Sequence, residues 1–306
     1  MNQTLVIGST VVDVFLSLPA LPRRGDDVNI EASKLRIGGC AYNVYKTLRL
    51  FNSPALLCSP VGTGLYGNIV KEHFKAEGLL PIADLEEENG CCYCLIEPDG
   101  ERTFLSHHGV EYLFSRSWMK NVDFSQASGV YISGLELEES TGVELINFVY
   151  DHPELELYFS PGPRIMYIPV ERIERILFRR DRNGKGPLIH LNEKEAFYIS
   201  VRGKAEDAAE YLAGKTGNIV IITLAELGCY CLKEAGTKGS FVPGFPAKVV
   251  DTVGAGDAHI GALIACLKEG MELEEACLRA NKIGSAVVGI RGAVLDKLPD
   301  LIGNPQ

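Results

Sequence analysis

The sequence lacks any apolar run of the roughly 18 residues that a membrane-spanning helix needs, so no such helix is expected in its 306 residues. It also lacks a basic amino-terminal region, because Met1-Asn2-Gln3-Thr4 precedes only the short apolar run Leu5-Val6-Ile7. This pattern does not fit a secretory signal peptide. No internal repeat and no low-complexity linker is visible.

Positive charge is also scarce, since 30 Lys and Arg residues stand against 40 Asp and Glu residues, giving a net charge of −10. An extended nucleic-acid surface needs a basic face, so we expect none here. The nine cysteines are an odd number spread over a long chain, which favours free thiols in a reducing cytoplasm over a disulfide framework. Apolar residues at 46% and charged residues at 23% exclude a largely disordered chain.

The periodicity of apolar residues predicts alternating strands and helices along most of the chain. Strands are expected at 5–8, 54–61, 129–133, 156–160, 188–191 and 218–223, and helices at 41–51, 66–78, 141–150, 168–178, 193–201, 205–215, 255–268 and 274–289. Such alternation gives parallel strands joined by helical crossovers. We therefore expect an α/β fold with a doubly wound, mostly parallel sheet sandwiched by helices. The runs 229–232 and 240–243 should add an antiparallel edge.

Two β segments, 10–38 and 91–107, depart from this alternation. The first contains a predicted strand at 12–18 and a loop at 19–25. In the second, two β-rich runs flank Pro98-Asp99-Gly100, a strong hairpin turn signal. We interpret both segments as a small β lid on a single α/β domain that spans residues 1–306.

The most informative stretch runs from Asp251 to Asp257, with the sequence Asp-Thr-Val-Gly-Ala-Gly-Asp, at the start of the predicted helix 255–268. Its small residues leave backbone N–H groups uncovered where the helix dipole favours an anion. Asp257 would place a carboxylate beside that anion, suited to take the proton of an alcohol that attacks phosphorus. An isolated Gly-x-Gly-Asp also suits a capped tight turn.

The string from Asp251 to Ile264 resembles the second signature of the PfkB carbohydrate kinase family, the ribokinase-like kinases. The segment from Gly38 to Asn43, with the sequence Gly-Gly-Cys-Ala-Tyr-Asn, is similar to the first signature. Asp13 matches an aspartate that ends a strand in that family and accepts hydrogen bonds from sugar hydroxyls. The resemblance implies a ribokinase-like fold and transfer of the γ-phosphate of ATP to a hydroxyl.

The same resemblance implies roles for individual residues. Asp257 would be the catalytic base, and the backbone amides of Gly254, Ala255 and Gly256 would hold the charge on the phosphoryl oxygens. The acceptor would be bound by Asp13, Gly38, Gly39 and Asn43, whose amide offers both a donor and an acceptor.

Three further segments resemble the segments that bind the nucleotide in that family. Asn192-Glu193-Lys194-Glu195 looks like the Asn-x-x-Glu element, in which Glu195 would act on Mg²⁺ through water, although a helix N-cap is an equally simple reading. The turn from Thr223 to Gly228 resembles the ATP-contacting turn, with Ala225 in place of a glycine. If that position needs a positive φ, Ala225 costs about 1 kcal/mol. The segment 281–293, starting at Asn281, resembles the adenine side.

In relatives, backbone carbonyls near the second signature can hold a monovalent cation, K⁺ or Na⁺. By resemblance, Asp251, Val253 and Gly292 are the candidates here. Dimerisation through the β lid is common among relatives, so a homodimer is expected on that ground alone.

The acceptor stays open. A nucleoside of ribose or pseudouridine type would suit an aromatic lid residue such as Phe15, Tyr93 or Phe104. A sugar phosphate would need a cation, which Lys34, Arg36 or Arg102 could supply. A non-catalytic binding protein is the alternative of another class, favoured by Ala225 and by the bulky Tyr42.

Other candidate sites have simpler interpretations. Cys91, Cys92 and Cys94, like Cys229 and Cys231, lie on predicted strands without the tight turns of a zinc site, so we expect structural thiols. His259 is expected to pack or hydrogen-bond locally. The acidic run 86–88 and the basic stretch 172–185 are expected to be a solvated turn and a solvated surface.

Overall fold

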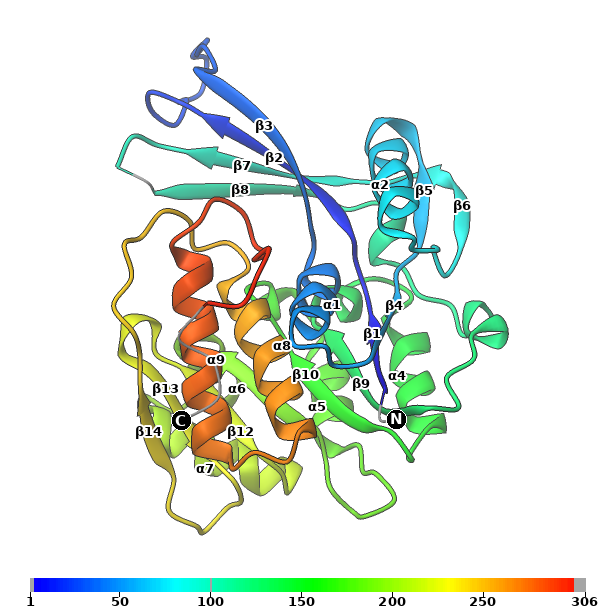
Figure 1. Cartoon of the computed structure of the whole chain (residues 1–306), viewed down its shortest axis with the longest axis vertical. Helices are drawn as coiled ribbons and strands as arrows, with labels where there is room; N and C mark the ends of the chain where they lie inside the picture. The colour runs from blue at the N-terminus through cyan, green and yellow to red at the C-terminus, as the bar shows by residue number, and fades with distance from the viewer. Residues whose placement is uncertain (1–2, 100, 300–306) are drawn as a thin grey trace.

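A computed structural model describes residues 3–99 and 101–299 (Figure 1). Its main sheet has eight strands in the order β14-β13-β12-β11-β10-β9-β1-β4. The strands are β1 (Gln3–Ile7), β4 (Ala55–Cys58), β9 (Ala127–Ser133), β10 (Glu156–Ser160), β11 (Leu188–Asn192), β12 (Val220–Thr223), β13 (Gly228–Leu232) and β14 (Ser240–Pro243). All pair in parallel except β13 and β14, which form the predicted antiparallel edge.

Helices cover both faces of this sheet, as predicted. They are α1 (Cys40–Leu50), α2 (Gly64–Glu77), α3 (Leu135–Glu138), α4 (Gly142–Asp151), α5 (Val170–Phe178), α6 (Glu193–Ser200), α7 (Ala205–Thr216), α8 (Ala255–Lys268) and α9 (Leu273–Val288). Strand side chains alternate between the two cores. Val6 of β1 packs in the core with α1, α8 and α9, whereas Leu5 and Ile7 pack in the core with α4, α5 and α7. Short 3₁₀ helices lie at 110–112, 118–121, 165–167 and 225–227.

A second sheet, which we call the lid sheet, has the order β3-β2-β7-β8. Its strands are β2 (Val11–Ser17), β3 (Ala32–Gly38), β7 (Cys91–Ile96) and β8 (Arg102–His107). The hairpin expected at 91–107 is confirmed, and Gly100 of its turn lies outside the described residues. Figure 1 shows the lid sheet over the amino-terminal end of α8.

The lid sheet has two distinct faces, because side chains alternate along each strand. The register places Asp13 opposite Cys92, and Phe15 opposite Cys94, which in turn lies opposite Phe104. We call the face that carries these five residues the inner face. Leu35, Val14, Tyr93 and Leu105 form a row on the opposite, outer face.

The expectation for the acidic run 86–88 was wrong. These residues belong to β6 (Asp84–Glu88), which pairs in parallel with β5 (Val61–Thr63) in a separate two-stranded sheet. Its acidic side chains stay mostly exposed while its backbone pairs with β5. In addition, Thr63 Oγ1 of β5 donates to the Glu86 carbonyl over 2.7 Å. The strand predicted at 54–61 is accordingly split into β4 and β5. All other predicted elements are present with ends within two residues of those expected.

Among residues 3–99 and 101–299, no helix is both long enough and apolar enough to cross a bilayer.

Candidate active site

The amino-terminal end of α8 forms an open cradle of backbone amides. Gly254 caps the helix with φ 74°, and a Cβ there would clash with Ala293. The N–H groups of Gly254, Gly256 and Asp257 have no hydrogen-bond acceptor in the described chain, whereas Ala255 donates to the Thr252 carbonyl over 3.4 Å. Gly256 is exposed. Free amides at a helix start favour an anion such as a phosphate.

Asp257 lies in the first turn of α8 beside these amides. Its Oδ2 accepts a hydrogen bond from Asn43 Nδ2 of α1 over 2.9 Å, and the Cys40 thiol also hydrogen-bonds to it. Burial raises the pKa of Asp257 to about 6; the Glu136 carboxylate adds to the rise, and the bonds from Asn43 and Cys40 oppose it. The group is therefore mostly ionised at neutral pH and ready to accept a proton.

Asn43 is held by this contact and keeps one group free. It is buried at 3% exposure, and its Oδ1 has no partner among the described residues. A buried polar atom without a partner is costly unless something binds it. The orphaned oxygen therefore marks a position for a donor, such as a hydroxyl.

The paired glycines bring Asp13 to the same place. A Cβ on Gly38 would clash with the Asp13 carboxylate, and one on Gly39, where φ is 101°, would lie 2.5 Å from the Ser9 carbonyl. Asp13 is the third residue of β2 and not a strand end, so that part of the expectation was wrong. Burial raises the pKa of Asp13 well above its ordinary value, and Cys92, Asp257 and Asp251 raise it further.

Asp251 organises the segment before the cradle. Its Oδ1 accepts from the Val253 amide and its Oδ2 from the Gly292 amide, each over 2.9 Å. The guanidinium of Arg102, from β8 of the lid sheet, lies 3.2 Å from Asp251 Oδ1 and donates to the Val250 carbonyl over 2.8 Å. The Asp251 carboxylate thus connects the three residues expected to bind a monovalent cation, and Arg102 links the lid sheet to them.

Asn192 and Glu195 form a capping box at the start of α6. Asn192 Oδ1 accepts from the Glu195 amide over 2.9 Å, while Glu195 Oε2 accepts from the Asn192 amide over 3.0 Å. The N-cap reading is confirmed. Burial raises the pKa of Glu195 to about 7, and the Asp257 carboxylate contributes to the rise. Glu195 therefore lies within electrostatic reach of the proposed phosphate site.

The turn after β12 has the backbone shape that the missing glycine would favour. Ala225 adopts φ 52°, in the left-handed region, and Gly228 adopts φ 104°. A Cβ on Gly228 would clash with the Val242 carbonyl, so glycine is needed there. Thr223 Oγ1 donates to the Leu191 carbonyl over 3.3 Å.

Asn281 is turned inward. Its Nδ2 donates to the carbonyls of Val242 and Pro243, each over 3.1 Å, and its Oδ1 lies 2.9 Å from Nε2 of His259. The amide is thus committed to the interior, which leaves only its backbone for a nucleotide. His259 is buried and packs in the interior, as expected, although its hydrogen-bond partners are distant in the sequence: besides Asn281, its Nδ1 lies 3.0 Å from Nε2 of the buried His190.

Sequence reasoning missed Glu136 and gave Cys40 no role. Glu136 is buried and accepts from the Ser9 amide over 2.9 Å and from Ser133 Oγ over 2.6 Å. Nothing in the local sequence at 134–139 marks it. Cys40 carried a usable signal, because it lies inside the first signature-like segment, three residues before Asn43.

Known proteins resemble this chain over most of its length. A family model described as "pfkB family carbohydrate kinase" matches residues 1–148 and 187–301. The chain is 33% identical over 296 residues to the "Uncharacterized sugar kinase YegV" of Escherichia coli, covering 95% of this chain and 90% of that protein.

Two solved structures share the fold. One is Arabidopsis thaliana ribokinase complexed with ribose and ATP (TM-score 0.75, 18% identity, 95% of this chain and 94% of that one). The other is Burkholderia thailandensis nucleoside kinase in complex with inosine (TM-score 0.78, 18% identity, 95% of this chain and 92% of that one).

Proposed function

The chain belongs to the pfkB family of carbohydrate kinases, and on that premise we propose that it transfers the γ-phosphate of ATP to a hydroxyl of a sugar or sugar-like acceptor, with Asp257 as the base. As a member of that family it is a phosphotransferase with an alcohol acceptor. The observation that carries the proposal is the pairing of one carboxylate with the free amides of Gly254, Gly256 and Asp257 at the same helix start.

In the proposed reaction the acceptor oxygen attacks the γ-phosphorus, its proton moves to an Oδ atom of Asp257, and ADP leaves. The three free amides of the cradle stabilise the charge that builds on the phosphoryl oxygens. ATP bound with Mg²⁺ supplies the γ-phosphorus and a partly neutralised leaving group. Because the pKa of Asp257 is about 6, the ionised base predominates at pH 7, where its proton affinity remains useful.

Acceptor binding is assigned to the residues around Asn43. Asn43 Oδ1 accepts a hydrogen bond from one acceptor hydroxyl, since this oxygen is buried and otherwise has no partner in the described structure. The Asp13 carboxylate accepts from a second hydroxyl. Gly38 and Gly39 bring the backbone close to the acceptor because neither carries a side chain.

The cofactor assignments rest on charge. Glu195 would hold the waters of Mg²⁺, which suits an ion that gives up its waters reluctantly. The carbonyls of Asp251, Val253 and Gly292 would hold a monovalent cation, and the Asp251 carboxylate connects these residues by accepting hydrogen bonds from the amides of the other two. A several-fold faster rate in K⁺ than in tetramethylammonium would support this cation site, and equal rates would remove it.

A nucleoside acceptor is the second candidate, favoured by the aromatic residues of the inner face. Phe15 and Phe104 flank Cys94 across the strands of the lid sheet, next to Asp13. Two flat rings beside a hydroxyl-binding carboxylate suit a base attached to a sugar. Tyr93 lies on the outer face, where its hydroxyl is 3.0 Å from that of Tyr66. For a sugar phosphate, Arg102 is already engaged by Asp251, so the cation would have to come from Arg36, which lies opposite Asp13, or Lys34, which lies opposite Phe15.

We also propose that residues 1–306 act as one domain, in which the lid segments 10–38 and 91–107 close over the acceptor and exclude water. The outer-face residues Leu35 and Leu105 are about half exposed, so this face would pair with a second copy of the chain in a homodimer. Light scattering would test the assembly: a monomer mass at micromolar concentration would contradict it.

The function is tested by ATP consumption with pentoses, hexoses, hexose phosphates and nucleosides, using wild type and Asp257→Asn. We expect turnover with at least one acceptor and a 10²- to 10⁴-fold loss of kcat in the variant, with ATP binding retained in calorimetry. Asp123→Asn, on an exposed loop, makes the same change away from the site and should be neutral. Near-full turnover by the Asp257 variant would remove Asp257 from the mechanism.

A further inference from the structure

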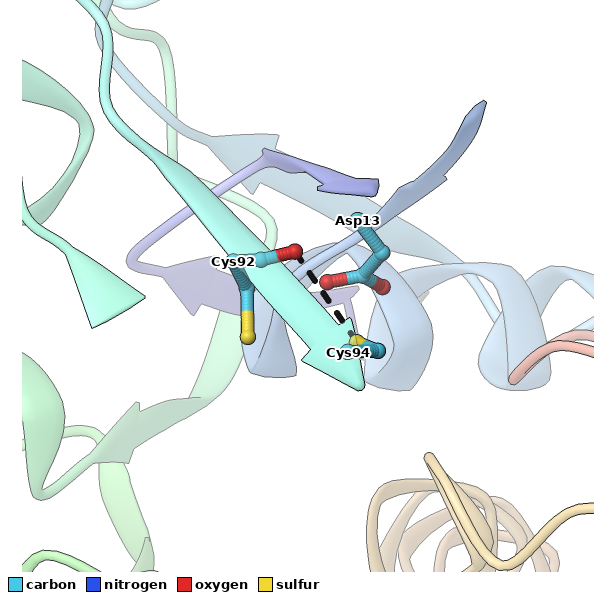
Figure 2. A group of neighbouring side chains, drawn as sticks. All are labelled: Asp13, Cys92 and Cys94. Carbon is cyan, nitrogen blue, oxygen red and sulfur yellow. Dashed lines mark hydrogen bonds between the residues drawn. The ribbon is translucent and has the colours of Figure 1, made fainter. Parts of the chain in front are cut away.

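The inner face of the lid sheet gathers a carboxylate and two thiols. Strands β2 and β7 pair in parallel with Asp13 opposite Cys92, and Cys94 lies two residues further along β7, on the same face. A carboxylate oxygen of Asp13 and the sulfur atoms of Cys92 and Cys94 all lie within 4.8 Å of one another. Figure 2 shows the Asp13 carboxylate directed toward the strand that carries the two cysteines.

We propose that Asp13, Cys92 and Cys94 form a binding site for a divalent ion of the zinc class, with the fourth position left to water. Zinc binds thiolate sulfur at about 2.3 Å and carboxylate oxygen at about 2.1 Å, so tetrahedral ligands lie roughly 3.5 Å apart. Side-chain rotation can supply the contraction from the observed limit of 4.8 Å. Three protein ligands and one open position are the usual arrangement of a zinc ion that remains accessible.

The surroundings support a cation of this kind. Asp257 and Asp251 both act electrostatically on Asp13, in the direction that favours a bound cation. The Ser106 hydroxyl of β8 donates to Cys92 Sγ over 3.9 Å, which is the outer contact that orients a ligand. The two thiols are free, as is every other cysteine in the described residues.

The donor set also decides which ion binds. Thiolates select zinc and similar ions, whereas Mg²⁺ requires oxygen ligands. The Mg²⁺ that accompanies ATP should therefore not fill this site. We expected structural thiols because the cysteines of one strand do not make a metal site by themselves. The third ligand, Asp13, comes from a strand nearly eighty residues away in the sequence.

The site would inhibit the proposed reaction. An ion held by Asp13 occupies the carboxylate that we assign to an acceptor hydroxyl, so metal and acceptor would compete. This consequence rests on the proposed function, whereas binding of the metal does not.

Metal binding is tested by titrating the reduced, metal-free protein with Co²⁺ and following the thiolate-to-cobalt absorption in the near ultraviolet. We expect one Co²⁺ per chain, displaced by Zn²⁺, with at least tenfold weaker binding in Cys92→Ser, Cys94→Ser and Asp13→Asn. Cys91→Ser is the matched control, because Cys91 is the preceding residue of β7 and points to the other face. It should bind Co²⁺ like the wild type.

Two results would overturn the site: no thiolate-to-cobalt band in the wild type, or an undiminished band in the Cys92→Ser/Cys94→Ser double variant. Circular dichroism of each variant checks the fold, and the Asp13→Asn variant keeps both thiols should a serine variant unfold.

Kinetics then test the consequence. Zn²⁺ at micromolar concentration should raise the acceptor KM several-fold without lowering kcat, and the double variant should lose this effect when compared with its own zinc-free rate. If Co²⁺ binds as expected but Zn²⁺ leaves the acceptor KM unchanged, the metal site stands and the placement of Asp13 in the acceptor site is wrong.

Discussion

Asp257 should impose an acid limb on the pH dependence of kcat/KM for the acceptor. Only the ionised carboxylate can take the proton, and burial raises its pKa to about 6. At pH 5 about one-tenth of the enzyme would carry the ionised base, so kcat/KM should be about tenfold below its plateau. The measurement is kcat/KM from pH 5 to 8 at saturating ATP.

Two substitutions should move the midpoint of this limb in opposite directions. Cys40→Ala removes a hydrogen bond to the Asp257 carboxylate worth about 1 kcal/mol, so the midpoint should rise by about 0.5–1 pH unit. Glu136→Gln removes a nearby negative charge, so the midpoint should fall. Glutamine keeps one acceptor for the Ser9 amide or the Ser133 hydroxyl, which bond to Glu136 in the wild type.

Glu269→Gln is the control, because it makes the same charge change just beyond α8, about 18 Å from Asp257 along the helix. Its midpoint should equal that of the wild type. Glu195, with a pKa of about 7, also titrates in this range. The midpoint alone therefore does not assign the limb to Asp257, whereas a shift of the midpoint in the Cys40 and Glu136 variants does. Identical midpoints in all four proteins would show that the limb does not belong to Asp257.

Three stability predictions follow from single contacts. Ala225→Gly removes the strain of an alanine with a positive φ but also gives the unfolded chain more freedom, so we expect a net gain in unfolding free energy of about 0.5–1 kcal/mol, or 1–2 °C in Tm by calorimetry. The control Ala213→Gly, inside α7, should lower Tm. A lower Tm in both variants would show that Ala225 is not strained. Arg102→Met leaves the buried Asp251 carboxylate without its cation, so urea unfolding should show a loss of about 3 kcal/mol; an unchanged midpoint would contradict this. Asn192→Ala breaks the capping box and should cost about 1 kcal/mol in the same assay, with no loss arguing against the cap.

Local pattern was enough to predict most of the fold. The hairpin at 91–107 and the helix at 255–268 have the predicted bounds, because their turn residues and apolar spacing lie within a few residues of each other. The pairing of β5 with β6 was missed because β6 is acidic and largely exposed. A strand that pairs only through its backbone needs no alternation of apolar and polar side chains, so the sequence carries no signal for it.

The candidate site likewise has a part that the sequence predicts and a part that it does not. The free amides and Asp257 belong to one helix start and could be read from consecutive residues. Contacts that cross the chain could not be read, since Ser9 bonds to Glu136 at a separation of 127 residues and Arg102 to Val250 at 148. The electrostatic environment that raises the pKa of Asp257 is therefore a property of the fold and not of the motif.

The two departures that favoured a non-catalytic protein have structural explanations. Tyr42 is buried, and its hydroxyl lies 2.6 Å from Nε2 of His73 on α2, so its bulk is accommodated by packing away from Asp257. Ala225 takes the positive φ that a glycine would take, at a cost of about 1 kcal/mol, small beside the stability of a chain this long. Neither departure disturbs the contact between Asn43 and Asp257, on which the proposed chemistry depends. A loss of catalysis would therefore have to arise elsewhere, and the acid limb tests Asp257 itself.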